Sequence, residues 1–292
     1  MLILSGLVLV GCGAFAIVQA ASGHLLPHDA IYLGMTAAEL CALQACRILH
    51  FMIHDRISFG GVLIGIGVLY IWLAAVPLRR REAWAWWALS ISAGAGLVSF
   101  LEYLGYGYLD TWHGAATLAL LPLFVGGLIR TRGLRCEVVE PMPFDLQSGA
   151  GRGRALLLLS SVGITGAGLT IAIVGMTSVF VPQDLEFIGM TRAAIGAINP
   201  HLIPLIAHDR AGFGGALVSF GVAMFACVRY ARVTRTLWYV LAIAGVAGFA
   251  TAVGVHPVIG YLSLTHLGPA VIGCVVFAAG LVLSRSTIVA MR

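Results

Sequence analysis

The sequence contains no lysine and few charged residues of any kind. Charged residues make up 10% of the 292 residues, against about 25% in soluble proteins, while 60% are hydrophobic. The absence of lysine excludes a retinal Schiff base, which needs a lysine amine. The 17 basic residues are all arginines and cluster in short segments between apolar runs. The formal net charge of +5 therefore comes from arginines that orient the helices in the membrane, and nucleic acid is not expected as a partner.

Several chemical motifs are also missing. The six cysteines form no CxxC pair, and no nucleotide-binding loop, Ser-His-Asp arrangement or HExxH motif is present. Cys41 and Cys46 lie five residues apart and could form a disulfide or bind a metal. We adopt the simpler interpretation that the cysteines are small apolar residues.

The apolar runs are long enough to cross about 30 Å of hydrocarbon as helices. The eight expected spans are residues 2–22, 48–76, 83–106, 113–130, 155–178, 202–228, 237–258 and 265–284. The sequence therefore predicts an all-α integral membrane protein of eight transmembrane helices, with the lipid bilayer as its principal partner.

The arginines predict the orientation of these helices. If the spans alternate in direction, 13 of the 17 arginines fall on one side of the membrane. The four that fall toward the other side are Arg47, Arg56, Arg192 and Arg210. Since basic residues favour the cytoplasmic side, we expect both termini in the cytoplasm and the segments 23–47 and 179–201 outside.

The two halves of the chain repeat the same motifs at an offset of 153 to 155 residues. The first copies are Asp29-x4-Gly-Met-Thr, His54-Asp55-Arg56-x2-Phe-Gly-Gly and Gly107-Tyr108-Leu109-x3-His113; the second are Asp184-x4-Gly-Met-Thr, His208-Asp209-Arg210-x2-Phe-Gly-Gly and Gly260-Tyr261-Leu262-x3-His266. This internal repeat predicts two tandem four-helix units, residues 1–130 and 155–292, joined by a cytoplasmic linker, residues 131–154. Because each unit has an even number of spans, a pseudo-twofold axis along the membrane normal should relate them.

The doubled motif Asp-x4-Gly-Met-Thr followed by His-Asp-Arg-x2-Phe-Gly-Gly resembles a group of uncharacterised bacterial multi-pass membrane proteins. The likeness covers most of each half. It implies the same helical fold and a location in the bacterial cytoplasmic (inner) membrane, and it implies no activity.

Two local patterns predict packing and capping. Gly61-x3-Gly65 and Gly215-x3-Ser219 are small-residue patterns that let helices approach closely. Thr36 followed by Glu39 three residues later is a capping box, which predicts a short surface helix.

All nine histidines map to the outer segments or to the outer ends of spans, which indicates a histidine-rich polar site near the outer leaflet. As cofactor ligands we consider His54 paired with His113, and His208 paired with His266, each within its own half; such pairs suit haem b or a transition metal. As metal ligands we also consider His50, His54, His208 and His256. The competing interpretation is that these histidines cap helices or bind backbone carbonyls.

The neighbouring charged residues are candidates for structural ion pairs. A charge at membrane depth costs about 2.5–3.5 kcal/mol on insertion scales, so Asp55, Arg56, Asp209 and Arg210 are expected to pair across helices. Asp29 and Asp184 are candidates for an outer lid over the site.

The favoured function is a membrane-embedded binding or redox protein that uses these histidines to hold haem or a transition metal. Two alternatives stay open. One is an accessory or structural subunit of a larger membrane complex, with other membrane subunits as partners. The other is a small-solute or proton-coupled transporter.

Overall fold

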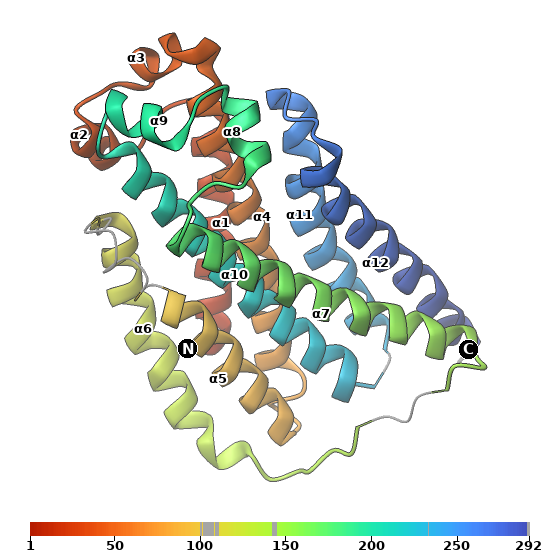
Figure 1. The fold of residues 1–292 in the computed structure, drawn as a ribbon. Helices are drawn as coiled ribbons and strands as arrows, with labels where there is room; N and C mark the ends of the chain where they lie inside the picture. Colours follow the sequence, from red (N-terminus) through yellow and green to blue (C-terminus); the bar gives the residue numbers. More distant parts are fainter. Residues whose placement is uncertain (100, 102–107, 109–110, 142–144, 233, 291–292) are drawn as a thin grey trace.

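The computed structural model describes the whole chain except residues 100, 102–107, 109–110, 142–144, 233 and 291–292, and it leaves out the side chains of residues 113 and 286–290. The described part is helical (Figure 1). Its α-helices are α1 (Leu2–Ala21), α2 (Pro27–Leu33), α3 (Ala37–Ala42), α4 (Arg47–Ala75), α5 (Ala83–Val98), α6 (Thr111–Thr131), α7 (Gly149–Met176), α8 (Pro182–Ile188), α9 (Arg192–Ile198), α10 (Leu202–Tyr230), α11 (Arg235–Ile259) and α12 (Leu264–Ala290), with short 3₁₀ turns η1 (Gln44–Cys46) and η3 (Arg132–Leu134).

Among the described residues, seven helices are long and apolar enough to cross a membrane: α1, α4, α6, α7, α10, α11 and α12. The prediction of a multi-pass helical membrane protein is confirmed at this level. The remaining expected span, residues 83–106, is represented by α5, which is apolar but has only 16 residues. Most of the rest of that span lies outside the described residues.

The long helices α4 and α10 form the centre of the bundle and are the most buried of the seven. They pack against each other. α4 also packs against α1 and α11, and α10 packs against α7 and α5. Helix α6 lies at the edge of the bundle and touches α1 and α5 (Figure 1). The two helices that carry the His-Asp-Arg triplets are therefore neighbours at the centre of the protein.

One end of the bundle is covered by the short helices α2, α3, α8 and α9, and we call it the capped end (Figure 1). The predicted capping box is confirmed: the Thr36 side chain accepts from the Glu39 amide and Glu39 accepts from the Thr36 amide. Cys41 and Cys46 form a disulfide at this end, so the interpretation of these two cysteines as simple apolar residues is wrong. This disulfide joins α3 to η1.

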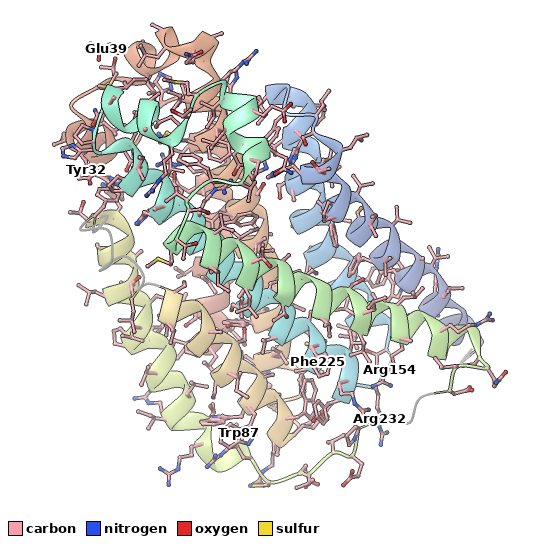
Figure 2. All side chains as sticks on the ribbon, viewed as in Figure 1. Tyr32, Glu39, Trp87, Arg154, Phe225 and Arg232 are labelled. Atoms are coloured by element: carbon pink, nitrogen blue, oxygen red, sulfur yellow. A yellow bond between two sulfur atoms is a disulfide. The ribbon has the colours of Figure 1, made fainter. Side chains whose placement is uncertain are left out.

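The two ends of the bundle differ in composition. Figure 2 shows Tyr32 and Glu39 at the capped end, and Arg154 and Arg232 at the opposite end. Arg154 donates to the backbone carbonyl of Arg229 at 2.6 Å, which joins the start of α7 to the end of α10.

Close helix contacts occur where glycine faces a neighbouring backbone. A Cβ atom on Gly61 would collide with the Ala247 carbonyl and Thr251 of α11, and one on Gly215 would collide with Ser99. The predicted packing role of these two glycines is confirmed. Gly60 faces Gly13 of α1 in the same way, because only hydrogen on both residues allows the two backbones to approach this closely.

We predict that Gly168→Val destabilises the bundle. The added side chain would meet the backbone of Gly214 and Val218 at 2.7 Å, so α7 and α10 must separate. Overpacking of this kind costs about 1–3 kcal/mol, which should lower the melting temperature of the purified protein by several degrees. Gly166→Val on the same helix is the matched control, since nothing lies within 4 Å of its Cβ position. Equal melting temperatures for the two variants would contradict this account of helix packing.

Candidate functional site

An ion-pair network lies beneath the capped end. The Arg56 guanidinium lies 2.7 Å from Asp29 Oδ2 through Nη1 and 2.8 Å from Asp209 Oδ2 through Nε. Asp29 comes from α2 and Asp209 from α10, so one arginine of α4 links three helices. Arg56 also donates hydrogen bonds to Asp209 from Nε and Nη2, and such bonds help to offset the cost of burying the charges.

The same arrangement recurs around the second triplet. Arg210 Nη1 lies 2.8 Å from Asp184 Oδ2 of α8, and Arg210 Nε lies 3.3 Å from Asp55 Oδ2 of α4. Arg56 thus pairs with an aspartate of α2 and with the aspartate of the second triplet. Arg210 pairs with an aspartate of α8 and with the aspartate of the first triplet. The four residues proposed for ion pairs do pair across α4 and α10. Asp29 and Asp184, expected to form a lid, are buried partners that anchor α2 and α8 over the network.

Tyrosines complete this network, in a role that was not predicted from the sequence. The Tyr108 hydroxyl donates to Asp29 Oδ1 at 2.6 Å, and the Tyr261 hydroxyl donates to Asp184 Oδ1 at 2.8 Å. Burial, and then the Asp184 carboxylate, raise the pKa of Tyr261 above its ordinary value, so its hydroxyl stays protonated and donates. The repeated Gly-Tyr-Leu motif could have indicated this role, because the tyrosine of each copy donates to the aspartate of the Asp-x4-Gly-Met-Thr motif in the same half of the chain.

The network carries more negative than positive charge. Its members are Asp29, Asp55, Asp184 and Asp209 on one side, and Arg56 and Arg210 on the other. Four carboxylates against two guanidiniums leave two negative charges, with the histidines counted as neutral. In a low-dielectric interior such an excess favours a bound cation nearby.

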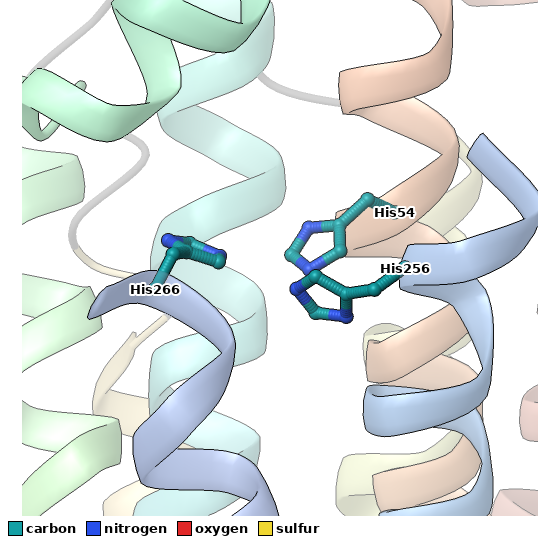
Figure 3. Close-up of side chains that lie close together, drawn as sticks. All are labelled: His54, His256 and His266. Carbon is teal, nitrogen blue, oxygen red and sulfur yellow. The ribbon is translucent and has the colours of Figure 1, made fainter. Parts of the chain in front are cut away.

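Three histidines meet beside this network. His54 of α4, His256 of α11 and His266 of α12 each place one ring nitrogen within 4.8 Å of the other two (Figure 3). The ring centroids of His54 and His256 are 4.5 Å apart, and His266 lies 5.5 Å from His54 and 5.4 Å from His256. We call these three residues the histidine cluster.

A tight reversal of the chain brings two of these side chains together. Gly260 ends α11 with φ of 80°, a left-handed conformation that glycine adopts without a steric penalty, and the Tyr261 amide donates to the His256 carbonyl at 3.0 Å. The chain then starts α12 at Leu264. His256 in the last turn of α11 and His266 in the first turn of α12 are therefore close in space.

The second nitrogen of each imidazole faces an acceptor. His54 Nδ1 lies 2.9 Å from Asp55 Oδ1, His256 Nδ1 lies 2.7 Å from the Ala252 carbonyl oxygen, and His266 Nδ1 lies 3.6 Å from Asp184 Oδ1. Since carboxylates and carbonyls only accept, the first two contacts place the proton of the neutral His54 and His256 rings on Nδ1, while the His266 contact is longer than a hydrogen bond. The Nε2 lone pairs of His54 and His256 then remain as ligand atoms.

His256 supplies the most direct sign of an incomplete site. The residue is 3% exposed, and its Nε2 is a buried nitrogen with no hydrogen-bond partner among the described residues. An unsatisfied buried acceptor costs about 1–3 kcal/mol, so such groups are rare unless something binds them. Here the unsatisfied nitrogen belongs to a cluster of potential metal ligands.

The structure combines the histidine candidates differently from the sequence interpretation. His266 was expected beside His208 of its own half, but it lies with His54 and His256, so the cluster joins the two halves of the chain. His50 and His208, both proposed as metal ligands, do not belong to this cluster; the His208 ring lies 5.1 Å from Tyr108. The side chain of His113 lies outside the described residues.

We predict that Arg210→Ala strongly destabilises the protein, because it leaves the buried Asp55 and Asp184 carboxylates without their counter-charge. Removing one member of a buried pair costs about 3–5 kcal/mol. Thermal unfolding in detergent would measure this as a large fall in melting temperature. Arg79→Ala is the control, since Arg79 is exposed. Similar melting temperatures for both variants would show that the pair contributes little.

Comparison with known proteins returns no relative. No family model, no curated protein and no solved structure matches the chain. The resemblance to bacterial multi-pass membrane proteins therefore stays a prediction.

Proposed function

We propose that the protein is a membrane-embedded metal-binding protein that holds one divalent transition-metal ion in the histidine cluster. The observation that carries the proposal is the convergence of His54, His256 and His266, with the Nε2 of His256 buried and unsatisfied. The proposal assigns the ligand role to the three Nε2 atoms.

The surroundings of the imidazoles support a metal ion. Metal-binding histidines usually donate their other N–H to a carboxylate or a backbone carbonyl, which fixes the ring and raises its basicity. Asp55 and the Ala252 carbonyl occupy these positions for His54 and His256, and the Asp184 carboxylate lies 3.6 Å from His266 Nδ1. A histidine that only binds water or packs in the core does not require an acceptor next to its second ring nitrogen.

Distances and charge also favour one ion. Nitrogen ligands lie about 2.0–2.1 Å from zinc, which places them roughly 3.3 Å from one another in a tetrahedral site. The present separations are at most 4.8 Å, so small side-chain rotations bring all three into range. A divalent ion bound by neutral imidazoles also balances the two excess negative charges of the ion-pair network.

A single ion is favoured over haem b. Two axial imidazoles of a haem must leave room for a porphyrin between their rings, while the His54 and His256 centroids are 4.5 Å apart. Imidazole suits zinc, copper, nickel and iron. With three protein ligands, a fourth coordination position stays open to water or a small ligand, as in catalytic metal sites.

The topology proposal comprises eight spans in two tandem repeats, residues 1–130 and 155–292, related by a pseudo-twofold axis along the membrane normal. Equivalent contacts in both halves support it: Arg56 with Asp209 and Arg210 with Asp55 are the clearest pair. The proposed location is the bacterial inner membrane, with both termini and the linker 131–154 in the cytoplasm. The disulfide at the capped end suits an oxidising outer compartment.

The metal proposal predicts that the purified protein binds about one Zn²⁺ or Co²⁺ per chain. His256→Ala should lower the affinity by more than the 10–100-fold typical of losing a supporting residue, because it removes a ligand itself. Isothermal titration with metal-free protein gives the affinity, and elemental analysis gives the stoichiometry. A tetrahedral Co²⁺ site would add visible absorption that identifies nitrogen ligation.

The matched control is His50→Ala, which removes a histidine one turn away from His54 on the same helix but outside the cluster. This variant should bind Co²⁺ as the wild type does. If His256→Ala and His266→Ala, checked for folding by gel filtration, keep the wild-type affinity, the metal proposal is wrong. A role as an accessory subunit would then be the better interpretation.

The topology proposal predicts the labelling of Cys136, which is exposed near the start of the linker. A membrane-impermeant maleimide should label it in inverted vesicles and leave it unlabelled in intact cells. Cys136→Ser should remove the signal, since Cys12, Cys227 and Cys274 are less exposed or buried. Labelling of Cys136 from outside intact cells would reverse the proposed orientation.

A further inference from the structure

A second candidate site is a partly open cavity of about 560 Å³, which is lined by α1, α4, α5, α6 and α10 and by none of the cluster histidines. Its walls are mainly apolar; Phe15, Leu63 and Phe124 represent the contributions of α1, α4 and α6. Ligand pockets in proteins span about 300–1,000 Å³, so this cavity is large enough for a small amphiphile. The loose contact of α6 with the rest of the bundle leaves this space between the helices.

One part of the cavity wall is strongly polar. Asp55, Arg56, His208 and Asp209 line it, and all four are buried or mostly buried. The same four residues belong to, or adjoin, the ion-pair network beneath the capped end. An apolar chamber that reaches buried charged side chains matches a ligand with one polar head and one apolar tail.

The charge of this wall determines which polar head group of a ligand it can accept. Two carboxylates, Asp55 and Asp209, line the cavity against one guanidinium, Arg56, so this wall repels an anionic head such as a phosphate or a carboxylate. Arg56 has five N–H groups, and its contacts with Asp29 and Asp209 use three of them. The wall therefore offers donors to a neutral head that accepts hydrogen bonds.

We propose that this cavity binds an isoprenoid quinone. The quinone ring is neutral and flat, its two carbonyl oxygens accept hydrogen bonds, and its tail is a single apolar chain. The ring would lie against Arg56 and His208, and the tail would extend between α1, α5 and α6. This assignment rests on the cavity and does not require a metal in the histidine cluster.

One residue connects the cavity with the histidine cluster. Asp55 lines the cavity and also lies 2.9 Å from His54 Nδ1 through Oδ1. A bound ring would therefore be separated from a cluster ligand by a single carboxylate. The two sites can be tested separately, because cavity-filling substitutions on α5 and α6 leave His54, His256 and His266 unchanged.

The test is titration of the purified full-length protein in nanodiscs with ubiquinone-2, followed by quenching of tryptophan fluorescence, since Trp112 lines the cavity. Ala116→Phe places a ring inside the cavity and should weaken binding at least about tenfold. Ala119→Phe is its control, because Ala119 lies on the same helix, is exposed and does not line the cavity. It should bind as the wild type does.

A second pair of variants, on α5, tests the same cavity in case the α6 variants do not fold. Gly96→Val enters the cavity, while Gly94→Val does not line it and has nothing within 4 Å of its Cβ position. Geranylgeraniol, which has the tail without the carbonyls, and phosphatidylglycerol, which has an anionic head, should both compete poorly. Equal binding by the filled and control variants would overturn the proposal. So would competition by either lipid as strong as that of unlabelled quinone, which would indicate a general lipid-filled space.

Discussion

The crossed pairing of Arg56 with Asp209 and of Arg210 with Asp55 is the constraint on which the rest of the structure depends. Charged side chains in apolar helices are costly alone, so each triplet needs the other. The pairing fixes α4 and α10 side by side at the centre of the bundle. Asp29 and Asp184 add the short helices of the capped end to the same network.

The network also determines what can bind around it. Its carboxylates orient His54 and His266 in the histidine cluster, and its excess of negative charge favours a cation there. Asp55, Arg56 and Asp209 of the network also line the cavity. In our two proposals, the same set of buried charges lies next to both a metal ion and a neutral polar ring.

Much of the helical fold could be predicted because it depends on local properties of the chain. Apolar runs, the Thr36 capping box and the small residues around Gly61 are read along one segment at a time. The disulfide of Cys41 and Cys46 was interpreted incorrectly, since composition alone cannot distinguish an apolar cysteine from a bonded one. The span expected at residues 83–106 is only partly described, as α5.

The sequence by itself determined which residues could carry chemistry: the repeated triplets, the outer histidines, and the aspartates that precede them. Only the tertiary structure decided which of these residues meet. His266 joins His54 across the two halves because α11 packs on α4, and the turn at Gly260 returns α12 to the same place. Motif spacing reports the order of residues along one chain. Contacts between halves depend on how the helices pack, which that order does not record.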